Sequence, residues 1–358
     1  MKNSFLLLIA LYGLFTSCIG RADAKGNVQA SNEACVKSVI SKSSSPMCID
    51  RYGKCWFTNK RDFISMYNTK TGTIDVFDDR HGLSSKIVYC FLEDQFGQVW
   101  MGTADGITIY DGRNFKKYTI SDITGRFGAS VANSFNANKA SSDLKNSVAA
   151  MMLDSQGKIW VAVQNELFVF NGRTFNKFIP SNASELSSND TKSCSWIGIE
   201  RILEDNQGRI WCGGRGLNGA YYINDNKLSL VKRSASEKWL MPIAQTKDGK
   251  LWLNDKDFGS LAFQKNDLSK DQLFPYWELQ VLEDSKGNLW FNNGENWGIT
   301  KYNGKEYTNY DSTALKTFYE RNYMSMVFDT NDVLYLSTVS GELITFDGKE
   351  FKVLMDGC

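Results

Sequence analysis

Among the residues that could carry acid–base or nucleophilic chemistry, histidine is scarce and the carboxylates Asp and Glu are abundant. His81 is the only histidine of the 358-residue chain, whereas Asp and Glu together number forty. His81 stands beside Gly82 in a segment typical of a turn, and nothing in the spacing supplies a Ser or Cys partner for it. We therefore predict no catalytic residue. A spatial pair of carboxylates, as in a glycoside hydrolase or a lyase, stays open as an alternative.

Metal ions and cofactors are not expected. The eight cysteines include no C-x-x-C pair, so the sequence indicates neither a zinc ribbon nor thioredoxin-like redox chemistry. Short Asp-x-x-Gly segments recur, but they lack the dense oxygen ligands of a calcium loop. Four cysteines fall in apolar, strand-like runs, where a thiol usually acts as a small hydrophobic side chain: Cys48, Cys55, Cys90 and Cys212.

Aromatic residues outside the repeated positions are the candidates for ligand binding. Flat rings with a few polar neighbours suit sugar rings, peptides or another protein. Trp239 and Trp277 each stand seven residues before a repeated turn position, at Thr246 and Asp284, which predicts equivalent places in the fold. The candidate set is Trp196, Arg215, Trp239, Tyr276, Trp277, Trp297 and Tyr323, with Phe258, Asp255 and Glu295 as neighbours. Packing of several of these rings beneath long loops is the alternative interpretation.

The elements that position these residues are revealed by an internal repeat. The segment LEDQFGQVWMGT (92–103) has six counterparts, which begin at residues 48, 152, 203, 244, 282 and 327. The shared pattern is apolar–x–Asp–x–x–Gly–x–apolar–Trp–apolar. Asp can accept hydrogen bonds from N–H groups two or three residues on, and Gly supplies a positive φ, so each unit predicts a turn between two strands. The fifth copy has Thr246 for Asp, and the seventh has Asp332 for Gly and Tyr335 for Trp.

A second hairpin follows in most repeats. Asp-Gly or Asn-Gly stands between aromatic strand residues at 110–115, 170–175, 302–307 and 346–351, with a weaker version at 223–228. That dipeptide favours a tight turn in which both central residues have positive φ. Two hairpins give four antiparallel strands per repeat, and seven such units predict an all-β, seven-bladed β-propeller. The aligned Trp side chains would fill the layers between blades.

One stretch resembles a known family. Residues 81–115, HGLSSKIVYCFLEDQFGQVWMGTADGITIYDGRNF, are similar to the two-component regulator propeller repeat in their GLSS opening, EDxxG turn and W-x-G-T strand. The resemblance extends over residues 45–354 and implies the fold and a tendency to bind ligands or proteins. Family members often form periplasmic sensor regions in which glycans are frequent cues. The chain has no kinase or span after its leader, so the resemblance does not carry over a signalling output.

The N-terminus predicts export. Lys2 precedes an apolar run from Phe5 to Phe15, which is too short to span a bilayer. Residues 15–18 resemble a lipobox, which predicts acylation of Cys18, whereas residues 22–24 fit ordinary signal cleavage; we favour the lipoprotein. The predicted organisation is a leader (1–24), a linker (25–44) and the propeller (45–358).

Closure of the ring brings its first and last blades together. Cys35 lies just before the first blade and Cys358 is the last residue, so a disulfide between them would join the two ends. A free thiol at Cys358 is the alternative. Every repeat holds all its own strands, so no strand exchange is required. The longest insertions, residues 119–147 and 179–198, are expected to be surface loops.

The composition limits the classes of molecule that the protein is expected to bind. Forty-one Lys and Arg against forty Asp and Glu leave a net charge of +1 with no basic cluster, which disfavours nucleic acid and leaves a lipid anchor as the only membrane contact. The sequence therefore predicts a non-enzymatic, extracytoplasmic protein that binds carbohydrate or protein, accessory to sensing or polysaccharide uptake. A propeller hydrolase or lyase, and a pure protein-interaction scaffold, are the alternatives.

Overall fold

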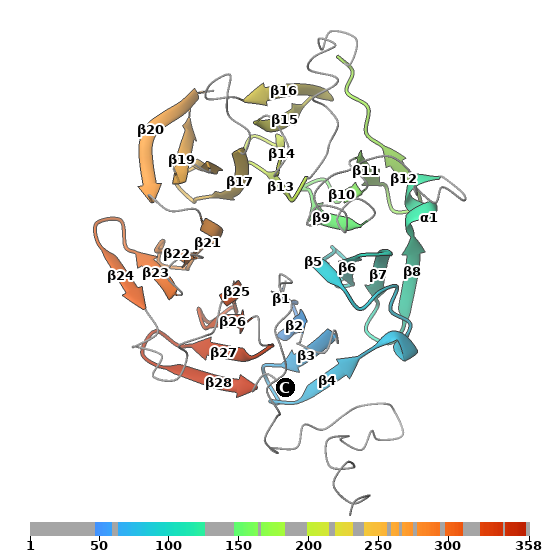
Figure 1. The fold of residues 1–358 in the computed structure, drawn as a ribbon, viewed down its shortest axis with the longest axis horizontal. Helices are drawn as coiled ribbons and strands as arrows, with labels where there is room; N and C mark the ends of the chain where they lie inside the picture. Colours follow the sequence, from blue (N-terminus) through green and yellow to red (C-terminus); the bar gives the residue numbers. More distant parts are fainter. Residues whose placement is uncertain are drawn as a thin grey trace, which may run out of the picture.

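The fold is a closed ring of antiparallel sheets. The structure, a computed structural model, describes residues 47–58, 64–125, 147–163, 166–182, 199–214, 219–231, 240–255, 259–264, 267–274, 278–293, 298–310, 323–338 and 341–355. Within these ranges, twenty-eight strands form seven four-stranded sheets, each built from consecutive strands (Figure 1). The prediction of a seven-bladed β-propeller is confirmed.

The first four blades occupy the chain up to residue 231. Blade 1 comprises β1 (Met47–Ile49), β2 (Lys54–Thr58), β3 (Ile64–Asn68) and β4 (Ile74–Phe77). Blade 2 comprises β5 (Val88–Glu93), β6 (Val99–Thr103), β7 (Gly106–Tyr110) and β8 (Phe115–Thr119). Blade 3 comprises β9 (Val148–Leu153), β10 (Ile159–Val163), β11 (Glu166–Phe170) and β12 (Phe175–Lys177). Blade 4 comprises β13 (Arg201–Glu204), β14 (Ile210–Gly213), β15 (Ala220–Asn224) and β16 (Lys227–Val231).

Three further blades complete the ring. Blade 5 comprises β17 (Leu240–Gln245), β18 (Leu251–Asp255), β19 (Gly259–Gln264) and β20 (Asp267–Phe274). Blade 6 comprises β21 (Glu278–Glu283), β22 (Leu289–Asn293), β23 (Gly298–Tyr302) and β24 (Tyr307–Tyr310). Blade 7 comprises β25 (Tyr323–Phe328), β26 (Leu334–Thr338), β27 (Leu343–Phe346) and β28 (Phe351–Met355).

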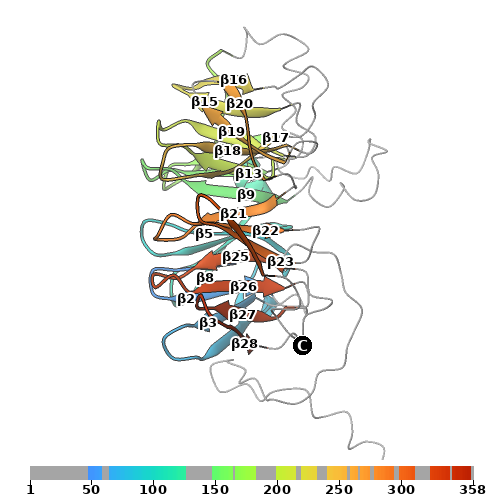
Figure 2. The same cartoon turned by 90° about the vertical axis from the view of Figure 1, so that its left-hand side faces the viewer.

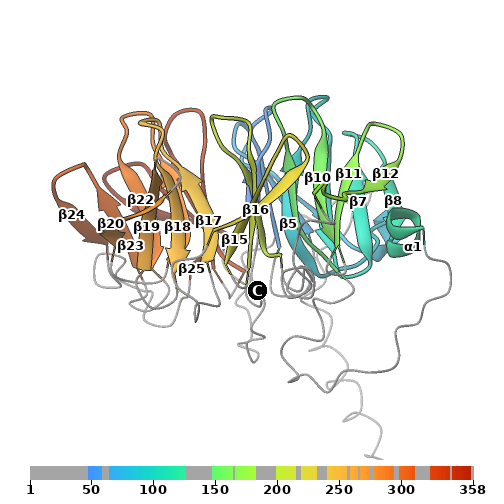
Figure 3. The same ribbon diagram turned by 90° about the horizontal axis from the view of Figure 1, so that it is seen from above.

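The ring has two distinct ends. The first strand of every blade lies nearest the axis and the fourth lies outside (Figure 1). Turns between first and second strands, and between third and fourth strands, gather at one end, which we call the turn face (left in Figure 2, top in Figure 3). The opposite end is the loop face, where each second strand leaves toward the third and each outer strand leaves toward the next blade.

Ring closure needs no shared strand. Blade 7 holds all four of its strands, and its inner strand β25 contacts β1 of blade 1. The prediction that no strand is exchanged between the chain ends is therefore confirmed. Cys35 and Cys358 lie outside the described residues, and the disulfide between them stays a prediction.

In the described part of the chain, two short helical turns lie between strands. The 3-10 turn η1 (Asp79–His81) follows β4, and helix α1 (Ile120–Thr124) follows β8. Thr119 caps α1 by accepting from the backbone N–H of Asp122, whose carboxylate in turn accepts from the N–H of Thr119. The expectation of a loop from residue 119 is thus wrong at its start, because a capping box nucleates a helical turn there. Residues 126–146 lie outside the described part.

The core consists of aromatic and aliphatic layers between blades. Trp56, Trp100 and Trp211 are no more than 2% exposed. Each packs on a ring of the next blade, as Trp100 does on Phe170 at 5.2 Å between ring centroids. A buried indole removes roughly 150–250 Å² from water. The blade faces are therefore sealed by the repeated aromatics, as predicted.

A glycine after the Trp lets adjacent blades approach closely. A Cβ on Gly102 would lie 2.5 Å from Cys90 Sγ and 2.9 Å from the carbonyl oxygen of Val148, the first residue of the next inner strand. Gly213 in blade 4 meets Leu240 of blade 5 in the same way, at 2.6 Å from its carbonyl oxygen. The W-x-G motif therefore has glycine at this position because the backbones of neighbouring blades contact each other there.

The outer hairpins differ from the predicted turn. In the turn between β7 and β8 of blade 2 (residues 111–114), only Gly112 has positive φ, and Asp111 Oδ1 accepts from the N–H groups of Arg113 (2.8 Å) and Asn114 (2.7 Å). The Asp side chain thus stabilises a four-residue loop between Tyr110 and Phe115, and the prediction of two positive φ values is wrong there. The two-residue turn occurs instead in blade 4, where Asp225 and Asn226 have φ of 48° and 61°.

Candidate functional site

Most of the ligand-binding residues predicted from sequence fall on segments that the structure does not describe. Tyr323 is described only as the first residue of β25. Asp255, proposed as a polar neighbour, ends β18 and is buried. The residues outside the described ranges are Trp196, Arg215, Trp239, Phe258, Tyr276, Trp277, Glu295 and Trp297, together with Cys18. Their role stays a prediction.

The repeated aspartates join each turn to its tryptophan. In blade 2, Asp94 Oδ1 accepts from the backbone N–H groups of Phe96 and Gln98, both at 2.9 Å. Asp94 Oδ2 accepts from the indole Nε1 of Trp100 at 2.9 Å. We call this arrangement the Asp–Trp clamp. It recurs as Asp50–Trp56, Asp154–Trp160, Asp205–Trp211 and Asp284–Trp290.

The clamp corrects and extends the sequence prediction. The second N–H comes from the residue four positions on, beyond the predicted two or three, because the turn contains five residues. Thr246 replaces Asp in blade 5 and accepts from Trp252 Nε1 at 3.3 Å. In blade 7, Asp329 keeps both backbone bonds, and the buried phenol of Tyr335 stands in for the indole. Burial raises the pKa of Tyr335 to about 12.

In blade 6 the hydrogen bonds of the clamp lower the pKa of its carboxylate, Asp284. Burial on its own raises the pKa of Asp284, but donors from Asn288, Trp290 and the backbone outweigh it, so the pKa is lowered overall. A carboxylate in this state is a structural acceptor.

His81 is also used for structure. Its Nδ1 lies 2.9 Å from Asp78 Oδ1 and 3.1 Å from the Asp78 backbone nitrogen, closing the capping box of η1. The ring packs edge-on against Phe77. This agrees with the interpretation of His81 as a turn residue.

The described thiols are buried in strands or partly so. Burial raises the pKa of Cys90 and Cys212 to about 12 and raises those of Cys48 and Cys55 as well. Thiols with such pKa values stay protonated at neutral pH and are poor nucleophiles. Their expected role as small hydrophobic side chains fits this environment.

Hydrogen bonds tie neighbouring blades together on the turn face. The residue after the clamp position donates its backbone N–H to the side chain that precedes the clamp position in the next blade. These bonds, which we call the belt, are Arg51–Glu93 (3.0 Å), Ser155–Glu204 (2.6 Å), Asn206–Gln245 (2.6 Å) and Lys247–Glu283 (2.8 Å). Ser285 uses Asp332 of blade 7 instead.

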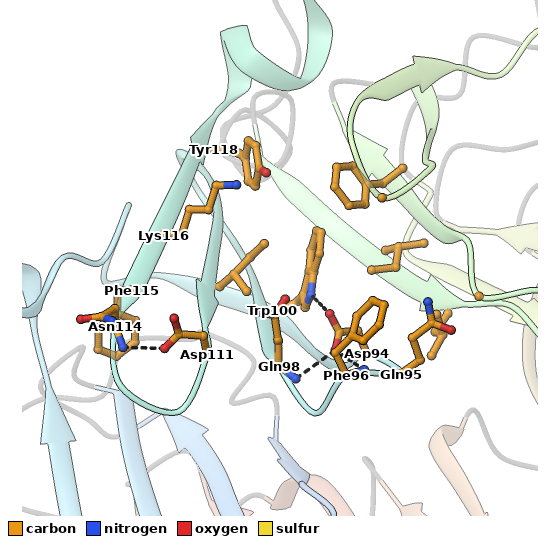
Figure 4. A pocket seen from close by; sticks show the side chains of 16 residues that line it. Asp94, Gln95, Phe96, Gln98, Trp100, Asp111, Asn114, Phe115, Lys116 and Tyr118 are labelled. Carbon is orange, nitrogen blue, oxygen red and sulfur yellow. Dashed lines mark hydrogen bonds between the residues drawn. The ribbon is translucent and has the colours of Figure 1, made fainter.

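The belt is interrupted between blades 2 and 3, and also between blades 7 and 1, where Ile49 stands at the acceptor position. The acceptor position between blades 2 and 3 is Leu153, which has no polar side-chain atom. A groove of about 230 Å³ opens at this junction (Figure 4). Its floor is apolar and includes Trp100, Ile109, Leu153, Ile159 and Phe170. Polar side chains surround this floor, and two aromatic rings lie among them: Gln95, Gln98, Asp111, Asn114 and Lys116, with Phe96 and Tyr118.

The rim of this groove is accessible. Phe96 is 72% exposed, and Lys116 Nζ lies 4.6 Å from the centroid of the Tyr118 ring (Figure 4). Sequence reasoning missed the groove. The available signal was a departure from the repeat: Leu153, like Ile49 and Phe328, stands where the other four copies have Glu or Gln.

The described residues hold no group of three or more His, Cys, Asp or Glu side chains suited to a metal ion. In the same part of the chain, no helix has the length and apolar character needed to cross a membrane.

Comparison with protein families identifies one repeat. Residues 82–105 match the family described as two component regulator propeller. The structure explains the motif: Ser84 of the GLSS segment donates its backbone N–H to Thr108 Oγ1 at 2.8 Å, and its hydroxyl lies 3.0 Å from Thr103 Oγ1, the Thr of W-x-G-T. Comparison with curated proteins finds no match.

Solved structures share the propeller. The extracellular domain of a hybrid two-component system from B. thetaiotaomicron matches with a TM-score of 0.60 and 22% identity, over 87% of this chain and 40% of that one. Virginiamycin B lyase from Staphylococcus aureus matches with a TM-score of 0.60 and 14% identity, over 86% of this chain and 97% of the lyase.

PorZ, a surface component of the type-IX secretion system of Porphyromonas gingivalis, matches with a TM-score of 0.56 and 14% identity, over 86% of this chain and 46% of PorZ. Identities this low establish a shared fold and nothing more specific. The chain is a seven-bladed β-propeller whose second blade opens with a two-component regulator propeller repeat.

Proposed function

We propose that this protein is a non-catalytic, extracytoplasmic binding propeller whose ligand is a glycan or a protein. One observation carries the proposal: the described residues best suited to catalysis serve the fold. His81 caps a turn, the clamp carboxylates hold turns and indoles, and the described thiols have raised pKa values. A rigid ring with variable connections at one end is suited to recognition.

The loop face is the proposed binding surface. Trp239 falls between β16 and β17, and Trp277 falls between β20 and β21, both connections from an outer strand to the next inner strand. The described ends of these strands lie at the loop face. Aromatic rings at that end, with Trp196, Arg215, Tyr276, Trp297 and Tyr323, would provide stacking surfaces for sugar rings or contacts for a protein.

Export and lipid anchoring complete the proposal. The proteins of known structure that share the fold include an extracellular domain and a surface component. The apolar N-terminal run and Cys18 support a lipid-anchored form, and a Cys35–Cys358 disulfide would suit an oxidising compartment. Mass spectrometry of protein from membranes should find acylated Cys18 and, without reductant, a linked Cys35–Cys358 peptide. An unmodified chain beginning at Lys25 would contradict the anchor.

Binding is tested with a glycan array followed by calorimetry on the purified protein. A glycan bound by the wild type should lose at least about tenfold in affinity in Trp239→Ala and Trp277→Ala, because each removes a stacking ring. Phe96→Ala is the matched control, since it removes an exposed aromatic from the turn face. Equal loss in the control, or no ligand among glycans and candidate proteins, would refute the loop-face site.

The lyase alternative has less support. The virginiamycin B lyase of known structure is a catalytically inactive variant in which one histidine is replaced by alanine. The only histidine here is held in the capping box of η1. Turnover of a polysaccharide or a cyclic peptide, abolished by one Asp or Glu substitution, would establish the enzymatic alternative instead.

A further inference from the structure

Three junctions between blades share one aromatic construction. The clamp tryptophan pairs across the hairpin with a residue of the third strand, as Trp100 pairs with Ile109 and Trp211 with Tyr222. A phenylalanine of the next blade packs on the indole. The three sets are Trp100–Ile109–Phe170, Trp211–Tyr222–Phe263 and Trp290–Lys301–Phe346.

The junction of blades 4 and 5 holds a cation of its own. The Arg209 guanidinium carbon lies 5.3 Å from the Trp211 ring centroid, 5.2 Å from that of Tyr222 and 5.7 Å from that of Phe263. Arg209 Nε donates to Asp205 Oδ2 at 2.6 Å, on the same oxygen that accepts from the indole. The construction therefore accepts a planar cation on aromatic faces beside the clamp carboxylate.

The junction of blades 6 and 7 also supplies a cation. Lys301 Nζ lies 5.2 Å from the Trp290 ring centroid, and Asn288 donates to Asp284 Oδ2 at 2.7 Å. The Trp290 ring therefore already contacts a cation, and Asp284 Oδ2, which accepts from the indole, also accepts a second hydrogen bond.

The junction of blades 2 and 3 has the same aromatic construction, but it has neither an arginine at the position of Arg209 nor a lysine at the position of Lys301. Gln98 stands where Arg209 stands in blade 4, and Ile109 stands where Lys301 stands in blade 6. Both line the open groove, and Gln98 is labelled in Figure 4. Asp94 is 3% exposed and lines it as well, with Oδ2 bonded to Trp100 Nε1.

The charges that line the groove favour a positive ligand. Asp94 and Asp111 carry two negative charges, and Lys116 contributes one positive charge over Tyr118. Arg51 lies close by but is neutralised by Glu93, to which its Nε donates at 2.5 Å. The groove therefore has a net negative charge above an aromatic floor.

We propose that this groove binds the guanidinium of an arginine presented by a partner polypeptide. The bound group takes the role that Arg209 plays between blades 4 and 5, stacking beside Trp100 and Phe170 and donating toward Asp94 or Asp111. Arginine fits better than lysine because its guanidinium is planar and more weakly hydrated than an ammonium group. The site lies on the turn face and is independent of the proposed loop-face ligand.

The test uses the full-length mature protein with N-acetyl-arginine methylamide as the probe. Binding is followed by the indole N–H signal of Trp100 in protein labelled with 15N-tryptophan, and by calorimetry with an arginine-containing peptide. Saturable binding is expected for the arginine probe, with at least about threefold weaker binding of N-acetyl-lysine methylamide.

Variants of the groove identify the mode of binding. Gln98→Arg places the chain's own guanidinium in the groove and should abolish binding with no loss of thermal stability. Asp111→Asn should weaken binding about threefold, and Lys116→Ala should strengthen it by a similar factor, as expected for exposed charges. Arg209→Gln is the matched gain-of-function control, since it opens the equivalent groove and should add a second site reported by Trp211.

Each other outcome overturns the proposal. Absence of arginine binding to the wild type refutes it, as does unchanged binding to Gln98→Arg. Binding of glucose instead, weakened by Lys116→Ala, would reassign the groove to a neutral sugar. Loop-face glycan binding is unaffected by any of these variants, so failure here is distinguishable from failure of the proposed function.

Discussion

The turn face and the loop face of this ring are built from different kinds of sequence. On the turn face, the turn between the first and second strands is five residues long in six blades, and its side chains bond to their own backbone, to an indole or to the next blade. On the loop face, the connections between blades differ widely in length, from the short one at residues 275–277 to the long one at residues 120–147. Repetition therefore marks residues that serve the fold, and departure from repetition marks residues free to serve recognition.

The largest expected effect contrasts two tryptophans. Trp211→Ala removes a fully buried indole from between blades and should reduce the free energy of unfolding by about 3–5 kcal/mol. Trp239→Ala, on a loop-face connection, should change it by less than about 0.5 kcal/mol. Urea unfolding followed by circular dichroism measures both, and similar losses would contradict the assignment of Trp239 to a surface role.

The clamp carboxylate should come next. Asp94→Ala removes the acceptor for two backbone N–H groups and the buried indole N–H, at a cost of about 2–3 kcal/mol in the free energy of unfolding. Asp79→Ala, which changes an exposed carboxylate of η1, is the control and should cost much less. Equal losses would show that the clamp adds little to stability.

A smaller effect should appear on acidification. The pKa of Asp284 is lower in the folded protein than in the unfolded chain, so its contribution is fully present above the unfolded value, near 3.9. It is lost as the pH falls through the folded value. Asp284→Asn should therefore lose less stability between pH 6 and the acid range (about pH 3) than the wild type does. A steeper acid dependence in the variant would reverse the assigned shift.

The smallest effect concerns the belt. Glu204→Leu removes the acceptor for Ser155 and should cost about 1 kcal/mol in the free energy of unfolding. Leu153→Glu would supply the missing acceptor opposite Gln95 and should gain at most a few tenths of a kcal/mol, because the new charge is partly solvated. Differential scanning calorimetry compares the two. A stabilised Glu204→Leu would show that the belt is incidental.

The blades were predictable because each repeat position has a local physical role. Asp accepts from the turn, Gly takes positive φ and Trp fills the layer between blades, so seven copies predicted seven blades. The indole–carboxylate bond was not predicted, because it depends on two side chains meeting on one face of a hairpin. The outer turns were assigned wrongly where an Asp side chain, as in Asp111, stabilises a longer loop.

The candidate site was harder to predict than the fold. The groove between blades 2 and 3 arises from what Leu153, Gln98 and Ile109 fail to supply, and such a deficit is recognised only once the neighbouring junctions are known. The loop-face aromatics depend on connections that follow no repeat. Their spacing relative to the turns, as for Trp239 and Trp277, gives their place along the chain but not their orientation.

Each blade is made from one continuous run of strands, and neighbouring blades meet through side chains and close backbone contacts without a shared strand. No strand therefore ties one particular pair of neighbouring blades together, so opening the polypeptide at a loop-face connection and joining it elsewhere would leave every described sheet intact. A ring of this kind can diversify by duplicating or exchanging single units, provided that the incoming unit presents a compatible surface to both neighbours. Each junction can then evolve its own chemistry while the circle stays closed.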